Sequence, residues 1–145
     1  MFYRAKNCIT TALALAICLL LGGFFCAKER VLLSKTQGER TFYLDSASSQ
    51  GLIKTELAFA DVFRIRGESV SFLCEQGNQE LVLQIFDSYG AEICFIERVG
   101  EITSYYGYAQ GLGAPVWVQG FAINLHVAVG ESRCAVGTPI IFGGF

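Results

Sequence analysis

The 145-residue sequence has a single histidine, His126, and charged residues make up only 17% of it. A histidine-rich metal site is therefore impossible, and a Ser-His-Asp or Cys-His arrangement has one possible base. The six cysteines show no CxxC spacing, which supports neither a thioredoxin-like redox centre nor a zinc ribbon. We expect no metal and no cofactor, and we identify no catalytic residue.

Positive charge is scarce outside the N-terminal region. The formal net charge is -2, but Arg4, Lys6, Lys28 and Arg30 all flank one apolar run. From residue 31 onward, seven Lys and Arg residues stand against twelve Asp and Glu residues. Binding to a polyanion needs clustered cations, whereas these are few and scattered. The composition therefore excludes nucleic acid as a partner.

The apolar run covers Cys8–Ala27, twenty residues without a charge. At 1.5 Å per residue, a helix of this length matches a hydrocarbon core of about 30 Å. The basic residues before it place the start in the cytoplasm. We therefore predict an anchor over residues 1–30, a single-pass location in the cell membrane, and an extracytoplasmic C-terminal domain. A cleaved signal peptide is the alternative, although Phe25 fits poorly where a small residue is preferred.

The rest of the chain is predicted to contain a short polar connection, residues 31–40, and an α+β domain, residues 41–145. Apolar residues at helical spacing, followed by Gly90, predict a helix over Gln79–Tyr89. We expect a single β-α-β(4) unit, with a mostly antiparallel sheet and one helix on one face. The expected strands, including one N-terminal to this unit, are Thr41–Leu44, Glu68–Cys74, Ala91–Val99, Ile102–Tyr108, Phe121–Val129 and Arg133–Ile141.

Part of this pattern resembles a known family. The stretch INLHVAV (residues 123–129), followed after a turn by VGTPIIFGGF (residues 136–145), comes after a strand-helix-strand unit. Over Glu68–Phe145 the chain resembles the YwmB family, Gram-positive membrane-associated proteins of unestablished function. The resemblance implies a fold like that of the TATA-box-binding protein, with a β-α-β(4) unit. It implies neither a reaction nor a catalytic residue.

One helix leaves the second face of such a sheet uncovered. The helix is expected to cover the face that bears Phe121, Ile123, Leu125 and Val127. Strand alternation then directs Asn124 and His126 to the other face, where the hairpin register can also bring Tyr106 and Tyr108. These four residues are our candidate partner-binding face. In the alternative, the N-terminal extension, residues 41–66, covers this face and makes Asn124 and His126 ordinary satisfied polar groups.

The function expected from the sequence is a non-enzymatic, membrane-anchored domain that binds a protein or other component of the cell envelope. The alternative is an envelope hydrolase or thiol enzyme that uses His126 with Cys134. A two-residue turn at Gly130-Glu131 pairs Val129 with Ser132 and sends Cys134 to the face opposite His126, which disfavours that alternative.

Three cysteines lie outside the apolar run, namely Cys74, Cys94 and Cys134. In an oxidising compartment one pair could form a disulfide and leave an odd thiol. Buried free cysteines are equally compatible with the sequence, so the pairing stays open.

Overall fold

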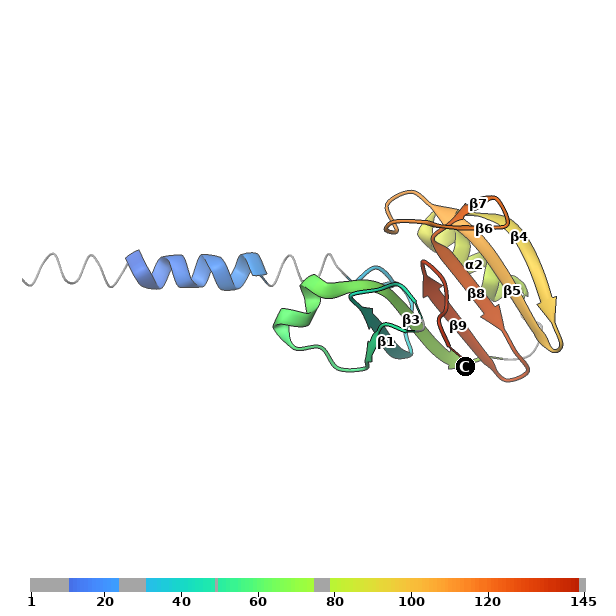
Figure 1. Cartoon of the computed structure of the whole chain (residues 1–145), viewed down its shortest axis with the longest axis horizontal. Coiled ribbons are helices and arrows are strands. Elements are labelled where there is room, and N and C mark those ends of the chain that lie inside the picture. Colours follow the sequence, from blue (N-terminus) through green and yellow to red (C-terminus); the bar gives the residue numbers. More distant parts are fainter. Residues whose placement is uncertain (1–10, 24–30, 49, 75–78, 144–145) are drawn as a thin grey trace, which may run out of the picture. The chain divides into compact units, whose positions relative to one another are not determined.

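The computed structural model describes residues 11–23, 31–48, 50–74 and 79–143. The chain divides into two compact units, Met1–Val31 and Leu32–Phe145. In the first unit, residues 11–23 are helical (Figure 1). The second unit contains all the strands of the described chain.

The predicted membrane anchor is the first correction. Among the described residues, no helix is long and apolar enough to cross a membrane. The helix over residues 11–23 is shorter than the twenty-residue run expected to span the bilayer, and residues 8–10 and 24–27 of that run lie outside the described residues. The described residues therefore do not support the predicted transmembrane helix or its single-pass location in the cell membrane.

Seven strands of the Leu32–Phe145 unit form one sheet, in the order β2-β1-β3-β9-β8-β5-β4. Every neighbouring pair is antiparallel, and β6 and β7 form a second, two-stranded antiparallel sheet. The elements are β1 (Glu39–Leu44), β2 (Leu52–Lys54), the 3₁₀ helix η1 (Phe59–Arg64), β3 (Ile65–Leu73), α2 (Gln79–Tyr89), β4 (Ala91–Val99), β5 (Ile102–Ala109), β6 (Val116–Val118), β7 (Phe121–Ile123), β8 (Leu125–Val129) and β9 (Arg133–Thr138).

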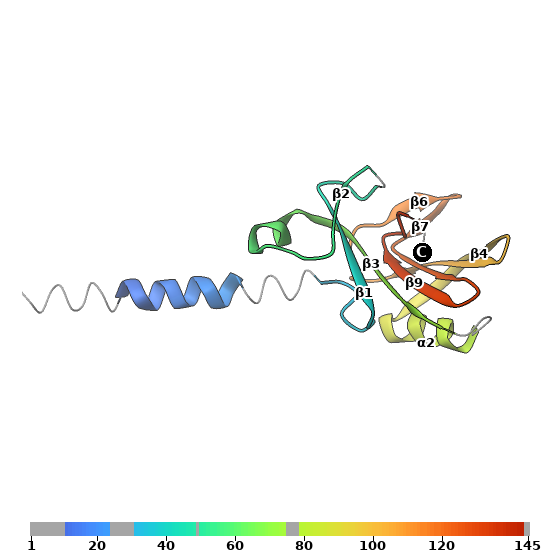
Figure 2. The ribbon, with the colours of Figure 1, turned by 90° about the horizontal axis from the view of Figure 1, so that it is seen from below.

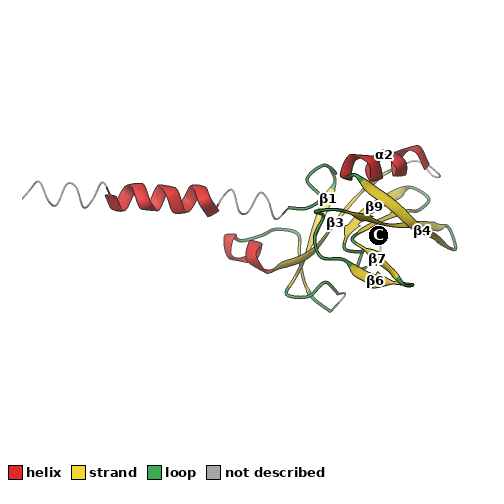
Figure 3. Ribbon diagram, turned by 90° about the horizontal axis from the view of Figure 1, so that it is seen from above, coloured by secondary structure: helices red, strands yellow, loops and turns green. Residues whose placement is uncertain are grey.

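The large sheet is covered on both faces. Figures 2 and 3 show α2 on one face and the β6–β7 hairpin on the opposite face. The predicted single β-α-β(4) unit is therefore wrong, because β1 and β2 extend the sheet beyond β3 and the hairpin interrupts the run of four strands. Antiparallel pairing was predicted correctly. We call the face opposite α2, which bears Ser69, Ser71, Ala135 and His126, the second face.

The main core lies between α2 and the sheet. Val82, Ile85 and Phe86 of α2 belong to one buried cluster with Leu125 and Val127 of β8. This confirms the expected contact of the helix with part of that strand. Burial of a side chain of this size is worth about 1.5–3 kcal/mol, so these contacts are a large share of the stability of a small domain.

The expected face is nevertheless wrong at its N-terminal end. Phe121 is 46% exposed and its ring lies 5.7 Å from that of Phe95 on the second face, while Ile123 is buried outside the helix-side cluster. The strand predicted over Phe121–Val129 is interrupted at Asn124, and its two halves belong to different sheets.

Close approach of α2 to the sheet depends on Gly107 in β5. A Cβ at this position would lie 2.3 Å from Cε1 of Phe86 and 2.3 Å from the carbonyl oxygen of Glu92. Because one of these atoms belongs to the backbone, a change of rotamer could not relieve both clashes.

A buried carboxylate attaches the beginning of the unit to the sheet. Glu68 in β3 is fully buried, and its Oε2 accepts hydrogen bonds from the backbone nitrogens of Leu32 (2.9 Å) and Leu33 (3.3 Å). Its Oε1 forms an ion pair at 3.1 Å with Nη1 of Arg40, whose Nη2 donates to the carbonyl oxygens of Leu33 and Thr36. Burial raises the pKa of Glu68, and Arg40 opposes that shift. The segment predicted as a polar connection is thus packed into the unit.

Candidate functional site

The side chains of β1, β3 and β9 form a hollow on the second face. Strand alternation carries Thr41, Ser69 and Ser71 to this face, because the intervening Val70 belongs to the helix-side core. The strand register places Thr41 opposite Ser69 and Ser71 opposite Ala135. Hydroxyl groups from two neighbouring strands therefore line one concave surface, which we call the β1–β3–β9 hollow.

An ion pair lies at the more exposed part of this hollow. Nη2 of Arg133 is 3.1 Å from Oε2 of Glu39 and 3.5 Å from Oγ of Ser71. The side chains of Arg133 and Glu39 are 45% and 84% exposed. Deeper in the hollow, the hydroxyl groups of Tyr43 and Ser69 are 3.1 Å apart, and both residues are buried. The hollow thus offers charged groups toward solvent and hydroxyl groups inside.

Apolar residues complete the lining. Ile53 of β2 lines the hollow together with Phe142, whose ring meets that of Tyr43 edge-on at a centroid distance of 5.3 Å. Phe142 comes from the segment after β9, which folds back over the second face so that the backbone nitrogen of Ile141 donates to Nδ1 of His126 at 3.2 Å. The volume of the hollow is about 340 Å³. This is at the small end of the range for small-molecule sites, about 300–1,000 Å³.

The four residues predicted as a partner-binding face lie elsewhere and differ in exposure. Tyr106 and His126 are paired across β5 and β8, and their rings stack at 4.2 Å. The other side of the Tyr106 ring stacks on Phe95 at 4.5 Å. Tyr108 is 41% exposed, whereas Asn124 and His126 are buried. Of the four, Tyr108 alone is largely open to solvent, so the residues do not form one accessible surface.

His126 is a neutral interior side chain. Its Nδ1 accepts the hydrogen bond from Ile141, so the neutral ring carries its proton on Nε2, which is buried and has no hydrogen-bond partner among the described residues. Burial lowers the pKa of His126 to about 4. A general base buried under its own chain has no access to a substrate, so this geometry does not support catalysis by His126.

The side chain of Asn124 makes hydrogen bonds that the backbone of a neighbouring strand would otherwise make. Its Oδ1 accepts a hydrogen bond from the nitrogen of Ala109 at 2.8 Å, and its Nδ2 donates to the carbonyl oxygens of Ala109 (2.8 Å) and Gly113 (3.2 Å). The side chain thereby continues the pairing of β5 beyond Gly107 and Leu125, where the main chain leaves the large sheet. These bonds satisfy the side chain of Asn124, as the alternative expectation required. The covering segments are the β6–β7 hairpin and the residues after β9, whereas the extension contributes strands to the sheet.

The predicted alternative dyad of His126 and Cys134 is not formed. Cys134 lies in the helix-side core and forms a disulfide with Cys74, on the face of the sheet opposite His126. The predicted two-residue turn is wrong. Val129 pairs with Cys134 rather than Ser132, so His126 lies opposite residue 137 instead of residue 135. The faces are unchanged because the register moved by two residues.

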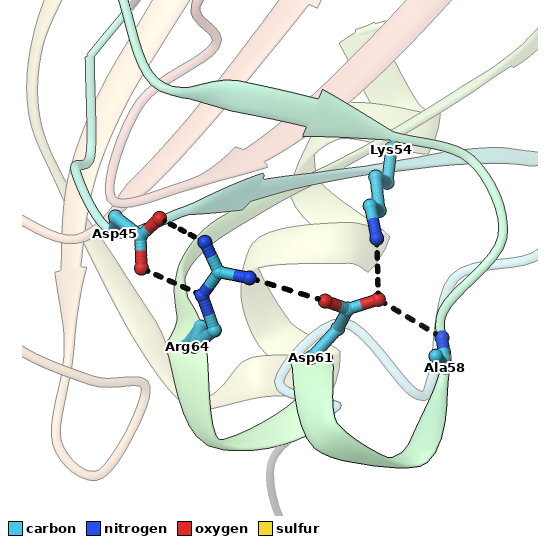
Figure 4. Close-up of polar contacts among 5 residues, drawn as sticks. All are labelled: Asp45, Lys54, Ala58, Asp61 and Arg64. Carbon is cyan, nitrogen blue, oxygen red and sulfur yellow. Dashed lines mark hydrogen bonds and ion pairs between the residues drawn. The ribbon is translucent and has the colours of Figure 1, made fainter.

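A separate cluster of charges joins the β1–β2 hairpin to η1 (Figure 4). Asp61 accepts hydrogen bonds from Nζ of Lys54 at 2.6 Å and from the nitrogen of Ala58 at 3.0 Å, and Arg64 forms an ion pair with Asp45. The bond from Lys54 holds the pKa of Asp61 below its usual value, and that from Arg64 does the same for the pKa of Asp45. Carboxylates held ionised by partners of their own chain stabilise the local fold and are poor general acids.

Sequence reasoning missed the hollow. Its residues come from strands far apart in the chain, and the short strand β2 was not predicted. The one available signal was the small polar residues Ser69 and Ser71, which alternate with apolar residues in β3. Within the described residues, no group of three His, Cys, Asp or Glu side chains could hold a metal ion.

Comparison of the chain with protein-family models, curated proteins and solved structures finds no match. The resemblance to the YwmB family stays a prediction, since none of these comparisons tests it.

Proposed function

We propose that the Leu32–Phe145 unit is a binding domain rather than an enzyme, and that the β1–β3–β9 hollow is where it binds a small polar molecule. The observation that carries the proposal is the hollow itself, about 340 Å³ in volume with hydroxyl groups, an ion pair and apolar side chains in its lining. Ligand sites commonly combine apolar surface with a few oriented polar groups.

The lining chemistry favours binding over catalysis. The described residues that line the hollow include no cysteine, histidine or lysine. Arg133 and Glu39, its charged members, pair with each other at the solvent side. Such groups can orient a ligand by hydrogen bonds, but the lining offers no activated nucleophile beside a base.

A thermal-shift screen of the full chain against amino acids, sugars and small carboxylates tests this proposal. We expect at least one class to raise the melting temperature, because a ligand that binds only the folded state stabilises it by mass action. Ser71→Phe fills the hollow and should abolish the shift.

The matched control is Ser88→Phe, which makes the same substitution at a second hollow of about 330 Å³ beside α2. If the rise in melting temperature caused by the ligand were lost in Ser88→Phe but retained in Ser71→Phe, the ligand would bind beside α2 rather than in the β1–β3–β9 hollow. No shift with any class would contradict the proposed function.

A further inference from the structure

The charges of the β1–β3–β9 hollow select among classes of small polar ligand. We propose that the hollow binds a free α-amino acid in its zwitterionic form, with an apolar side chain. This inference rests on the proposed function, and it adds the class of ligand.

The ion pair of Arg133 and Glu39 favours a ligand that carries both charges. Arg133 and Glu39 carry opposite charges 3.1 Å apart, so this part of the hollow is electrically balanced. An anion bound to Arg133 alone would lie beside the Glu39 carboxylate and be repelled by its like charge. A cation bound to Glu39 alone would be repelled by Arg133 in the same way. A zwitterion gives each side chain a new partner, with the ligand carboxylate at the guanidinium and the ligand ammonium at the carboxylate.

Opening the existing pair costs little. Exposed ion pairs contribute little net stability, and both side chains of this pair are substantially open to solvent. The hydroxyl of Ser71, 3.5 Å from Nη2 of Arg133, and that of Thr41 offer further hydrogen bonds to the same ligand groups. A ligand can therefore exchange with the pair without disturbing the core.

The rest of the lining favours an apolar ligand side chain. Ile53 is 51% exposed and lines the hollow with Phe142. A side chain the size of leucine would cover part of this surface, and removing apolar area from water favours binding. The volume of about 340 Å³ suits a single amino acid better than a longer peptide.

The test is a titration of the ¹⁵N-labelled full chain, followed by NMR, with L-leucine, L-leucinamide and N-acetyl-L-leucine. The amide lacks the carboxylate, and the acetyl derivative lacks the ammonium group. We expect L-leucine to shift the amide signals of β1, β3 and β9 in the low-millimolar range. Each derivative should bind at least about tenfold more weakly, because a hydrogen bond to a charged group is lost.

Substitutions of the ion pair test whether L-leucine binds in the hollow. Arg133→Gln and Glu39→Gln should each weaken binding of L-leucine by about tenfold, and Arg98→Gln, at an exposed arginine in β4, should leave it unchanged. Equal binding of N-acetyl-L-leucine would show an anion site, and equal binding of L-leucinamide a cation site. Either result overturns the zwitterion while leaving the proposed function in place. L-leucine that shifts no signal of the hollow also overturns it, and the proposed function falls only if the wider thermal-shift screen fails as well.

Discussion

The disulfide between Cys74 and Cys134 provides the sharpest quantitative test of the fold. It joins the residue after β3 to the second residue of β9, and the nitrogen of Cys74 also donates to the carbonyl oxygen of Ser132 at 3.1 Å. The cross-link spans 60 residues of sequence, which include α2 and β4 to β8. In the chain-entropy description, closing a loop of this length destabilises the unfolded chain by about 4 kcal/mol. We expect the double variant Cys74→Ala with Cys134→Ala to lose about that much stability.

The assay is equilibrium unfolding in urea, monitored by circular dichroism and extrapolated to water. A loss of about 4 kcal/mol is a large fraction of the 5–15 kcal/mol typical of a domain. Reduction of the wild-type chain should give a loss of similar size. The matched control is Cys94→Ala, because Cys94 is a partly exposed free cysteine in β4 and its removal opens no cross-link.

Two results would refute the reasoning. A double variant less than about 1 kcal/mol weaker than wild type would show that the cross-link does not restrict the unfolded chain as described. A loss in Cys94→Ala as large as in the double variant would show that cysteine removal, rather than loop opening, is responsible. In that case the bond makes no special contribution to stability.

Three further predictions concern buried polar side chains. Asn124→Ala should cost about 2–4 kcal/mol in urea unfolding, because the backbone nitrogen and oxygen of Ala109 are left buried without partners; a loss below about 1 kcal/mol would mean that water replaces the amide. His126 becomes protonated near pH 6.5 in the unfolded chain but near pH 4 when folded, so stability is full above pH 6.5 and should fall by about 3 kcal/mol as the pH drops to 4; His126→Leu should remove this dependence on pH. Glu68→Ala should lower the free energy of unfolding by about 3–5 kcal/mol, because Arg40 loses its carboxylate partner. Thermal unfolding of Glu68→Ala and of Arg40→Ala tests this, and melting temperatures equal to that of the wild type in both variants would contradict it.

Local patterns predicted the local elements well. Helical spacing before Gly90 led to Gln79–Tyr89, the observed bounds of α2, and the run Ala91–Val99 is the observed β4. In both segments a strong pattern of apolar residues agrees with the packing of the finished unit, so propensity and tertiary structure favour the same conformation. The strands that end at Leu44 and begin at Arg133 were also recognised.

What failed depends on contacts that spacing does not encode. The alternation through Phe121–Val129 continues without a break, yet Asn124 ends the strand by using its side chain in place of the backbone. The β6–β7 hairpin turns at Gln119 and Gly120, both with positive φ, where Gly120 fits the turn but Gln119 is not one of its preferred residues. The predicted binding residues Asn124 and His126 are inside for a related reason, since the β6–β7 hairpin and the segment after β9 fold back over them, and strand alternation does not encode that fold-back.

The exposed edge of β4 bears on whether two copies of the chain can pair through their sheets. β4 is the last strand of the large sheet, and strands in this position readily pair with other chains. A bulge between Ile93 and Phe95 interrupts its register, and the exposed charges of Glu97 and Arg98 follow. Such irregularity and charge hinder edge-to-edge addition of a second sheet.

The interior strand β8 differs from the edge strands in its protection from solvent. All five of its residues are buried, between the helix-side core on one face and the covering segments on the other. Its amide hydrogens can therefore exchange with solvent only when the whole unit opens, whereas those of β2, a three-residue edge strand, can exchange by local fraying. The cooperative core of the Leu32–Phe145 unit thus includes the strand that carries His126, whereas the edge strand β2, which contributes Ile53 to the hollow, belongs to its more loosely held margin.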